Sequence, residues 1–439
     1  MTWGAAPAAA EVAARTAPAD TQGAEVFLSV KGRSRLLAVA LVPFGLDSSA
    51  AGHTAEAAQL FGILRNDLAN AVRFEVAVDS LGADSSGWGA VLERWTRAGA
   101  SALLRGSVLG YPDRLEVFAT LYRLPDRRML IAKAYPAPPG QSAAAMHRLS
   151  DDVVFALTGQ MGIASSRLAY IGEWDGHPEV HLMTWDGQEA RAVTVDRALA
   201  LSPAWAPDGR RLAYSSLQGQ RWELYVVDLI SGARRAVPTP SAMSTAPCWS
   251  PDGERLLFAM VDGGNIDLYT VEVSSGRLQR VTDHPETDTE PDWSPDGTRI
   301  AFVSDRTGLP QVYIADARGG EARRLTWEPD AYEGSPAWSP DSKRIAFVRR
   351  GFDGFDIYVS EVEGGLPVRL TAGGSNENPS WSPDGLQLVF GRTVGTQDDI
   401  YVMNYDGTNL RQLTADGKST MPTWSPRLDM DSLVQYGSR

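Results

Sequence analysis

The sequence predicts an α/β domain followed by an all-β, six-bladed β-propeller, and three observations lead to this prediction. The 439 residues exceed what a single hydrophobic core usually serves. A phrase typified by "WSPDGTRIAF", which begins at Trp293, returns in related forms through the C-terminal part of the chain. Residues 24–163 carry no such repeat, and strand-like and helix-like stretches alternate there.

Strand-like stretches of the first domain are rich in β-branched and aromatic residues. They cover residues 25–30, 36–44, 74–79, 102–108, 114–124 and 128–135. Two helical patterns lie among them. Residues 54–71 place Ala58, Phe61, Leu64 and Leu68 on one stripe, and residues 146–159 do the same with Leu149, Val153, Ala156 and Leu157. Residues 159–166, with two glycines and two serines, are the expected joint to the propeller.

Tryptophans at a nearly constant spacing mark the second domain. They are Trp205, Trp249, Trp293, Trp338, Trp381 and Trp424, separated by 44, 44, 45, 43 and 43 residues. A period of this length is typical of propeller blades. One unit contains four short β-rich runs, residues 299–304, 311–316, 322–326 and 335–339, which would make one four-stranded blade.

The Ser-Pro-Asp-Gly sequence that follows Trp249, Trp293 and Trp381, with close variants after Trp205 and Trp338, has a local explanation. Proline presets φ for a turn, aspartate accepts from nearby backbone amides, and glycine takes the left-handed position that follows. Tryptophan can fill the wedge between neighbouring twisted sheets, and its ring N–H then needs one partner. The phrase is therefore interpreted as structural.

Six strand-like runs each open one unit, at residues 167, 211, 255, 299, 344 and 387. The first unit has no tryptophan strand ahead of it, whereas residues 421–426 form such a strand with no unit behind it. An open ring would expose two sheet edges, so we expect residues 421–426 to complete the first blade.

Residues 1–23 are rich in alanine and proline, and we expect them to be a disordered tail or the remnant of a signal peptide. The predicted domains are then residues 1–23, 24–163 and 164–439. Residues 1–166 hold 15 acidic and 15 basic side chains, so the net charge of -13 lies entirely in the rest of the chain. A nucleic acid is therefore an unexpected partner, because binding phosphates needs a basic face. The single cysteine, Cys248, is interpreted as core filler.

Motifs for catalysis, metal or cofactor binding are weak. No Gly-x-Ser-x-Gly occurs, and the "GKS" at residues 417–419 lacks the glycine that a phosphate loop requires. His177 and His181 would lie on one strand about 13 Å apart, too far to share a metal, so surface histidines are the expectation. We therefore expect no catalytic, cofactor or metal site.

Acidic residues gather in the loops that would surround the channel mouth. Residues 282–292 hold Asp283, Glu286, Asp288, Glu290 and Asp292, residues 327–336 hold Glu328, Asp330 and Glu333, and residues 372–379 hold Glu377. This acidic rim would steer a basic partner segment or hold a cation. Ordinary solvated loops are the alternative interpretation.

The chain resembles the TolB family, whose members are periplasmic components of the Tol-Pal system. The resemblance rests on residues 36–44, 102–108, 118–130 and 147–171, and on propeller phrases such as "TEPDWSPDG" and "SDRTGLPQVYIADARGGEARRLT". It covers nearly everything after residue 24. The N-terminal phrases and the Leu-Thr-Gly joint are its specific part, because many propellers share the other phrases.

This resemblance implies a non-catalytic, monomeric periplasmic scaffold that supports outer-membrane integrity and constriction during cell division. It implies that the propeller channel mouth binds the lipoprotein Pal, that an N-terminal arm binds TolA, and that these partners alone tie the protein to the envelope. The expected Pal-binding residues are Ala246, Thr289, Glu290, Pro291, Glu333 and Glu377, and the expected arm residues are Glu25, Val26, Phe27 and Leu28. Met243 stands where the family usually has histidine. Glu290 is expected to be an exposed loop charge, replaceable by lysine without harm to the fold.

A propeller enzyme, or a stand-alone peptide- or sugar-binding propeller, is the alternative function. An enzyme would place several titratable groups deep in the channel within hydrogen-bond reach of one another, whereas a scaffold needs only a rim patch.

Overall fold

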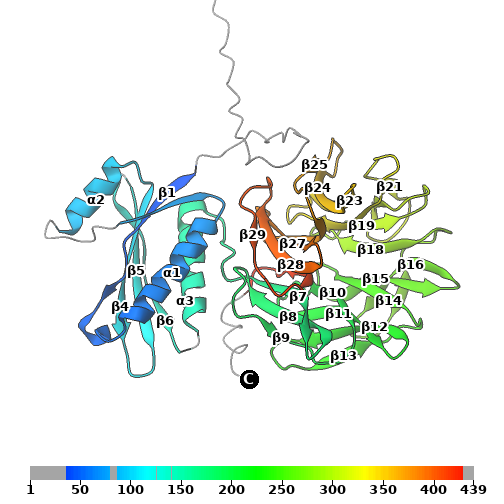
Figure 1. Cartoon of the computed structure of the whole chain (residues 1–439), viewed down its shortest axis with the longest axis horizontal. Coiled ribbons are helices and arrows are strands. Elements are labelled where there is room, and N and C mark those ends of the chain that lie inside the picture. Colours follow the sequence, from blue (N-terminus) through cyan, green and yellow to red (C-terminus); the bar gives the residue numbers. More distant parts are fainter. Residues whose placement is uncertain (1–35, 80–86, 125, 140, 429–439) are drawn as a thin grey trace, which may run out of the picture. The chain divides into compact units, whose positions relative to one another are not determined.

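The first part of the computed structural model is a mixed β-sheet with three α-helices (Figure 1). The structure describes residues 36–79, 87–124, 126–139 and 141–428, and residues 34–439 belong to one compact unit. The elements are β1 (Leu37–Leu41), β2 (Gly45–Leu46), the 3₁₀-helix η1 (Ser48–Ala50), α1 (Thr54–Asn70), β3 (Phe74–Val78), α2 (Trp88–Arg97), β4 (Ala102–Gly110), β5 (Leu115–Arg123), β6 (Arg128–Ala137) and α3 (Ser142–Thr158). The sheet order is β3-β1-β4-β5-β6, with β2 paired to β4.

Side chains along and just after β1 point alternately to the two faces of the sheet, and each face has its own apolar core. Val39 and Leu41 belong to the core under α1 and α3, whereas Ala40 and Val42 belong to a smaller core with α2. Successive strand side chains point to opposite faces, so a five-residue strand can serve both layers. None of the described helices combines the length and the apolar character needed to cross a bilayer.

The helix predictions for this domain need two corrections. The buried stripe of α1 runs through Ala57, Leu60, Leu64 and Leu68, and Ala58 is exposed. Helix α2 was not predicted, because it is short and its mixture of tryptophans and charged residues gives no long apolar stripe. The predicted strand at residues 25–30 lies outside the described residues.

The second part consists of six four-stranded antiparallel sheets. Their strand orders are β10-β11-β12-β13 (Ala200–Trp205, Arg211–Gln218, Arg221–Asp228, Arg234–Val237), β14-β15-β16-β17 (Ser244–Trp249, Arg255–Asp262, Asn265–Glu272, Leu278–Arg280), β18-β19-β20-β21 (Asp288–Trp293, Arg299–Ser304, Gln311–Asp316, Arg323–Arg324), β22-β23-β24-β25 (Glu333–Trp338, Arg344–Arg350, Phe355–Glu361, Val368–Arg369), β26-β27-β28-β29 (Ser375–Trp381, Gln387–Val394, Gln397–Asn404, Arg411–Gln412) and β30-β7-β8-β9 (Thr420–Trp424, Arg167–Trp174, His177–Thr184, Arg191–Ala192). The predicted six-bladed propeller is confirmed.

The last strand closes the ring by joining the first blade, as predicted. Thr423 pairs with Ala169 and Trp424 with Leu168. The Trp424 ring N–H donates to the Ser166 hydroxyl at 2.7 Å, and the Ser425 amide donates to the Arg167 carbonyl at 2.8 Å. The two ends of the propeller are thus fastened by a ladder and by side chains.

The repeated phrase has the structural role that the sequence indicated. Asp296 accepts from the Thr298 amide at 2.9 Å and from the Ser294 hydroxyl at 2.7 Å, and Gly297 takes φ 75°. The Trp249 ring N–H donates at 3.2 Å to a carbonyl of the preceding blade, that of Ala204. The phrase therefore makes a turn, and the ring N–H groups of Trp205, Trp249 and Trp381 each join two blades.

Candidate functional site

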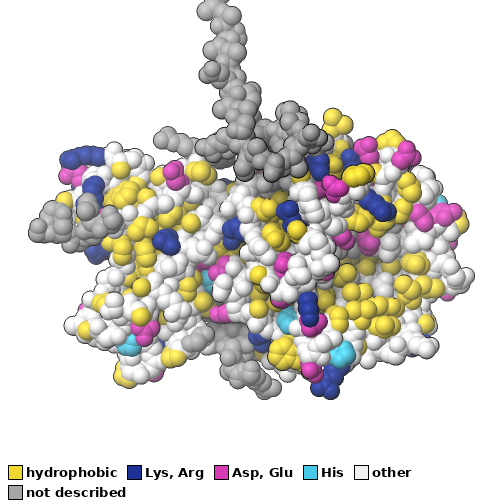
Figure 2. Space-filling view, in the orientation of Figure 1, with side chains coloured by type: hydrophobic (Ala, Val, Ile, Leu, Met, Phe, Trp, Pro, Cys, Tyr) yellow, Lys and Arg dark blue, Asp and Glu magenta, His cyan; other side chains and the backbone are white. Residues whose placement is uncertain are grey.

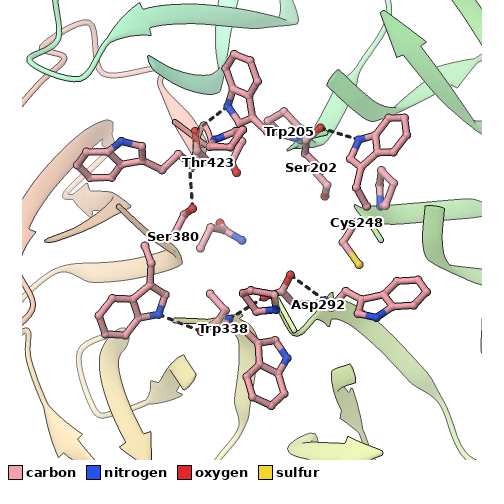
Figure 3. Close-up of a pocket in the computed structure, with 18 of the residues that line it drawn as sticks. Ser202, Trp205, Cys248, Asp292, Trp338, Ser380 and Thr423 are labelled. Atoms are coloured by element: carbon pink, nitrogen blue, oxygen red, sulfur yellow. Dashed lines mark hydrogen bonds between the residues drawn. The ribbon is translucent and has the colours of Figure 1, made fainter. Parts of the chain in front are cut away.

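An open channel runs between the six blades. The first strands of the blades, β10, β14, β18, β22, β26 and β30, contact one another in a closed ring. They surround a cavity of about 750 Å³. Figure 3 shows Cys248, Asp292, Ser380 and Thr423 around its open centre. The wall also includes the prolines of the turns that follow the tryptophans, so the channel extends from the third or fourth residue of most first strands into these turns.

Each first strand enters the channel through a β-bulge with a left-handed residue. The register shifts in all six strands just before the tryptophan. Non-glycine residues take φ between 47° and 53° there, and they are Ser202, Ala246, Glu290, Ser335, Asn378 and Met421. This conformation is uncommon for residues with a Cβ atom, and such strain tends to gather at binding sites. All six line the channel and form one ring, here named the bulge ring.

Polar side chains in the channel wall tie neighbouring blades together. The Asp292 carboxylate accepts from the Trp338 amide at 2.7 Å and from the Trp293 amide at 3.1 Å. Ser380 has the same role in its own blade, because its hydroxyl accepts from the Trp424 amide at 3.0 Å. Burial raises the pKa of Asp292 to about 7, although both amide donors favour the charged form.

Replacing Asp292 should reveal this titration as a pH-dependent gain in stability. The folded carboxyl binds its proton more tightly than the unfolded one, so its contribution to stability is present at low pH and is lost as pH rises toward about 7. Asp292→Asn removes the buried charge and keeps one oxygen, which can accept from the Trp338 amide, but it loses the acceptor of the Trp293 amide. We therefore expect the melting temperature of the variant relative to wild type to be higher at pH 8 than at pH 5.

Ser380→Ala serves as the matched control for this experiment. It removes the equivalent bond without removing a charge, so its effect on the melting temperature should be the same at both pH values. An Asp292→Asn effect that does not change with pH would contradict the proposed titration.

Glu290 differs from its predicted role as an exposed loop charge. Its carboxylate accepts from the Ser335 amide at 2.7 Å and from the Ser335 hydroxyl at 3.3 Å, so it joins two blades at the bulge ring. A Cβ atom on Gly334 would lie 2.9 Å from the Tyr332 ring and 3.2 Å from this carboxylate, so a larger residue there would have to displace one of these side chains. Burial raises the pKa of Glu290 despite the hydrogen bonds from Ser335. The predicted exposure of this charge is therefore wrong, and we now expect lysine here to lower the stability of the fold.

Arginines neutralise much of the predicted acidic rim. Asp288 and Glu333 are fully buried, and they pair with Arg306 at 2.9 Å and with Arg349 at 2.7 Å. Glu328 also pairs with Arg349, at 3.0 Å. Asp283 pairs with Arg280. On the face seen in Figure 2, acidic and basic side chains are interspersed rather than gathered in one patch.

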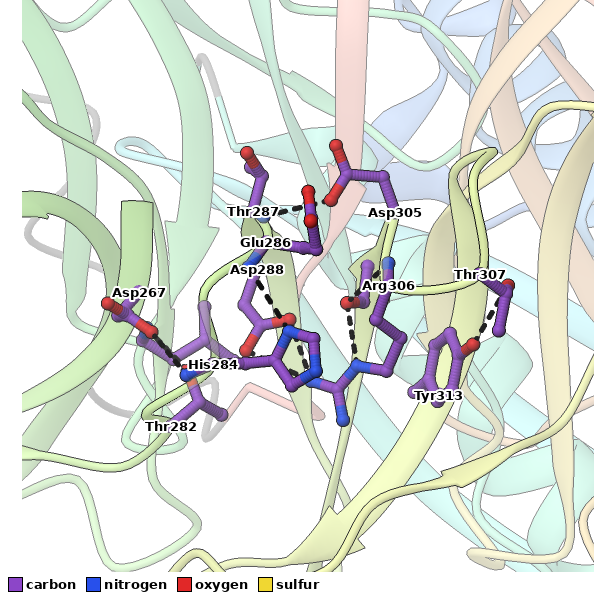
Figure 4. A network of polar contacts seen from close by, with 12 residues as sticks. Asp267, Thr282, His284, Glu286, Thr287, Asp288, Asp305, Arg306, Thr307 and Tyr313 are labelled. Carbon is purple, nitrogen blue, oxygen red and sulfur yellow. Dashed lines mark hydrogen bonds and ion pairs between the residues drawn. The ribbon is translucent and has the colours of Figure 1, made fainter. Parts of the chain in front are cut away.

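The loop that leads into β18 is held by polar contacts with neighbouring turns (Figure 4). The Thr287 amide donates to Asp305 at 2.8 Å. The His284 amide donates to Asp267 at 3.3 Å. The Arg306 guanidinium lies 4.8 Å from the centre of the Tyr313 ring. These contacts anchor the loop to β16 and to the turn after β19.

Only part of the predicted Pal-binding set meets at the channel. Ala246, Glu290 and Pro291 line it. Thr289 pairs with Val303, Glu333 is buried against Arg349, and the Glu377 carboxylate accepts from the Ser375 hydroxyl. The other bulge-ring residues, Ser202, Ser335, Asn378 and Met421, were missed, although their place three residues before each tryptophan could have identified them. The predicted arm residues, 25–28, lie outside the described residues.

His181, which was expected at the surface, is buried, and so is His147, for which no prediction was made. His181 is 7% exposed, and its Nε2 atom has no hydrogen-bond partner. His147 is 4% exposed and pairs with Asp67 at 2.8 Å. Among the described residues, Asp67, His147 and Asp186 are the group whose polar atoms lie close enough to suggest a metal ion. The direct 2.8 Å contact shows that His147 and Asp67 hydrogen-bond to each other, and the pair is an ion pair when the imidazole is protonated.

Comparison with known proteins agrees with this architecture. A family model described as the TolB beta propeller domain matches residues 154–428. The Tol-Pal system protein TolB of Acinetobacter baylyi is 30% identical over 199 residues, which is 44% of this chain and 44% of the relative. That of Dechloromonas aromatica is 36% identical over 139 residues, which is 31% of this chain and 33% of the relative. The chain thus matches less than half the length of these curated relatives.

A solved structure covers much more of the chain. The crystal structure of TolB from Acinetobacter baumannii superposes with a TM-score of 0.78 and 29% identity, covering 91% of this chain and 98% of that one. The match therefore includes the N-terminal mixed sheet as well as the blades. Together with the family model, which matches more than half of the chain, it shows that this chain belongs to the TolB β-propeller family.

Proposed function

We propose that this chain is the TolB component of a Tol-Pal system and acts as a non-catalytic interaction scaffold in the periplasm. It binds Pal at the bulge ring, and it binds TolA through an arm that includes Glu25, Val26, Phe27 and Leu28. Through these two partners it supports outer-membrane integrity and the constriction of the outer membrane during cell division. Its attachment to the envelope is through the partners alone.

The bulge ring is the observation that carries the Pal proposal. Six strained residues surround one open mouth, and side chains from all six blades converge there. A protein segment that enters such a ring can contact several blades at once, whereas a flat rim offers only a few contacts. The ion pairs Asp288–Arg306 and Glu333–Arg349 leave less negative potential than the sequence indicated. The fit of the partner's shape and its hydrogen bonds in the ring should therefore contribute more to the affinity than long-range electrostatic attraction of the partner.

The channel chemistry supports a scaffold more than an enzyme. Asp292 and Glu290, the two carboxylates in the channel wall, direct their oxygens to backbone amides of the next blade. General acid–base catalysis needs such groups free to reach a substrate. Met243, where the family usually has histidine, is 39% exposed near the ring, so it would offer Pal an apolar contact in place of a polar one.

Removing the arm should separate the two proposed partners. A chain that begins at Lys31 should lose binding to TolA and keep binding to Pal, because the bulge ring remains complete. Surface plasmon resonance with purified TolA and Pal measures both. Equal loss of both partners, or an unchanged affinity for TolA, would contradict the assignment of the partners to separate regions.

The melting temperature of the truncated chain is the control. It should stay within a few degrees of the full chain, since a detachable arm buries little surface in the free protein. A large decrease would mean that residues 24–30 belong to the core of the first domain.

A further inference from the structure

A buried histidine connects the N-terminal domain to the propeller. His147 lies on α3, and its Nδ1 atom is 2.8 Å from the Asp67 carboxylate of α1. The third group, Asp186, comes from the turn after β8 in the first blade, and polar atoms of all three lie within 4.8 Å of one another. His147 and Asp67 are 4% and 1% exposed. One imidazole ring is thus placed between carboxylates of two domains.

The groups around this histidine define its charge environment. Asp186 accepts from the Thr184 hydroxyl at 2.6 Å, which orients its carboxylate. Asp151, one turn along α3, is engaged by the Ala164 and Ser165 amides at 2.8 and 3.0 Å. The guanidinium of Arg411, on β29, lies over the Trp185 ring at 5.4 Å and faces Asp186. Three carboxylates therefore act on the imidazole, and the Arg411 guanidinium acts on one of them, Asp186.

Two fully buried polar atoms at this contact, Asp67 Oδ1 and Trp185 Nε1, lack a well-formed hydrogen bond, although the Trp185 indole still favours the charged form of Asp67. Burial raises the pKa of Asp67, because it penalises the charged carboxylate. A protonated imidazole compensates the charges on Asp67 and Asp186 together, whereas a neutral ring does not. The arrangement is therefore suited to the protonated ring.

We propose that His147 is a pH-sensitive latch between the two domains, which holds the N-terminal domain against the first blade while the imidazole is protonated and loosens this contact when the proton is lost. Loss of the proton would lower the stability of the contact between the two domains. This effect does not depend on which partner each domain binds.

The charge environment sets the direction of the pH effect. Burial alone would lower the pKa of His147, but the carboxylates of Asp67, Asp186 and Asp151 raise it above its ordinary value. A raised folded pKa means that the stabilisation is complete below the unfolded pKa of about 6.5 and is lost as pH rises through the folded value. The interface should therefore be tightest in mildly acidic solution and loosest above neutrality.

Hydrogen exchange of the full chain tests the latch. After correction for intrinsic rates, protection of residues 184–188 and of the last turn of α1 should fall at least about threefold between about pH 6 and about pH 8.5. In His147→Gln this pH dependence should vanish. His177→Gln, a change to a histidine outside the contact, should keep the wild-type profile. Wild-type protection that is equal at the two pH values would overturn the proposal.

An NMR titration keeps the test informative if His147→Gln does not fold. The His147 ring signals should titrate above the ordinary value in wild type and at a lower pH in Asp186→Asn, which leaves the Asp67 contact intact. An unshifted titration in Asp186→Asn would overturn the role of the propeller carboxylate. Both experiments are repeated in EDTA, because a pH profile that disappears there would indicate a bound metal ion and would also overturn the proposal.

Discussion

A chain that ends at Asp416 should lose cooperative folding of the propeller. This truncation removes β30, whose pairing with β7 closes the ring, and with it Trp424, which is 5% exposed. Loss of a buried tryptophan alone costs about 3–5 kcal/mol, which is a large share of the about 5–15 kcal/mol that stabilises a typical domain. Thermal unfolding followed by circular dichroism should show a decrease of many degrees or no transition.

A second truncation isolates the strand from the residues that follow it. A chain that ends at Leu428 keeps every β30 contact described above and should melt far closer to the full chain than the Asp416 truncation does. If both truncations melt at the wild-type temperature, the ring is not held closed by β30.

Glu290→Lys should destabilise the propeller as well as alter its channel. The substitution removes the acceptor of the Ser335 amide and hydroxyl and brings an ammonium group against the buried amide. An unsatisfied buried donor costs about 1–3 kcal/mol. Urea unfolding should show a loss of this size in the free energy of unfolding.

Two matched variants make the interpretation of Glu290 specific. Glu290→Gln retains an oxygen that can accept from the Ser335 amide, so its loss should be much smaller. Glu286→Lys introduces the same charge change on an exposed position of the same loop and should be nearly neutral. Equal stability of Glu290→Lys and Glu286→Lys would show that Glu290 does not join the blades.

The propeller could be predicted from the sequence because the residues that define its strands and turns are close together in the chain and recur from blade to blade. The tryptophan spacing gives the blade number, and each Ser-Pro-Asp-Gly turn is made by neighbouring residues such as Asp296 and Thr298. Closure by β30 could be predicted because the first unit has no tryptophan strand ahead of it. The last tryptophan strand has no unit after it, so it was left to complete the first blade. The shift of the buried stripe from Ala58 to Ala57 in α1 is the usual error at the boundary of an amphipathic pattern.

The candidate site was harder to predict because its contacts join distant residues. Arg306 follows Asp288 by 18 positions and Arg349 follows Glu333 by 16, so the rim appeared acidic when each loop was considered alone. The bulge ring has six positions occupied by five residue types, none of them glycine, so no residue type marks the left-handed conformation. The pair of Asp67 and His147 spans 80 positions and two helices, and no local pattern indicates it.

The most direct test of the central claim is a calorimetric titration of the full chain with the purified periplasmic domain of Pal. Wild type should bind with one-to-one stoichiometry. Ala246→Lys, which extends a charged chain from the bulge ring, should weaken binding by more than about tenfold, or about 1.4 kcal/mol. Ala246→Asn, which suits the left-handed conformation, should bind nearly as wild type. Absence of heat with wild type, or equal affinity of wild type and Ala246→Lys, would contradict recognition of Pal at the channel mouth.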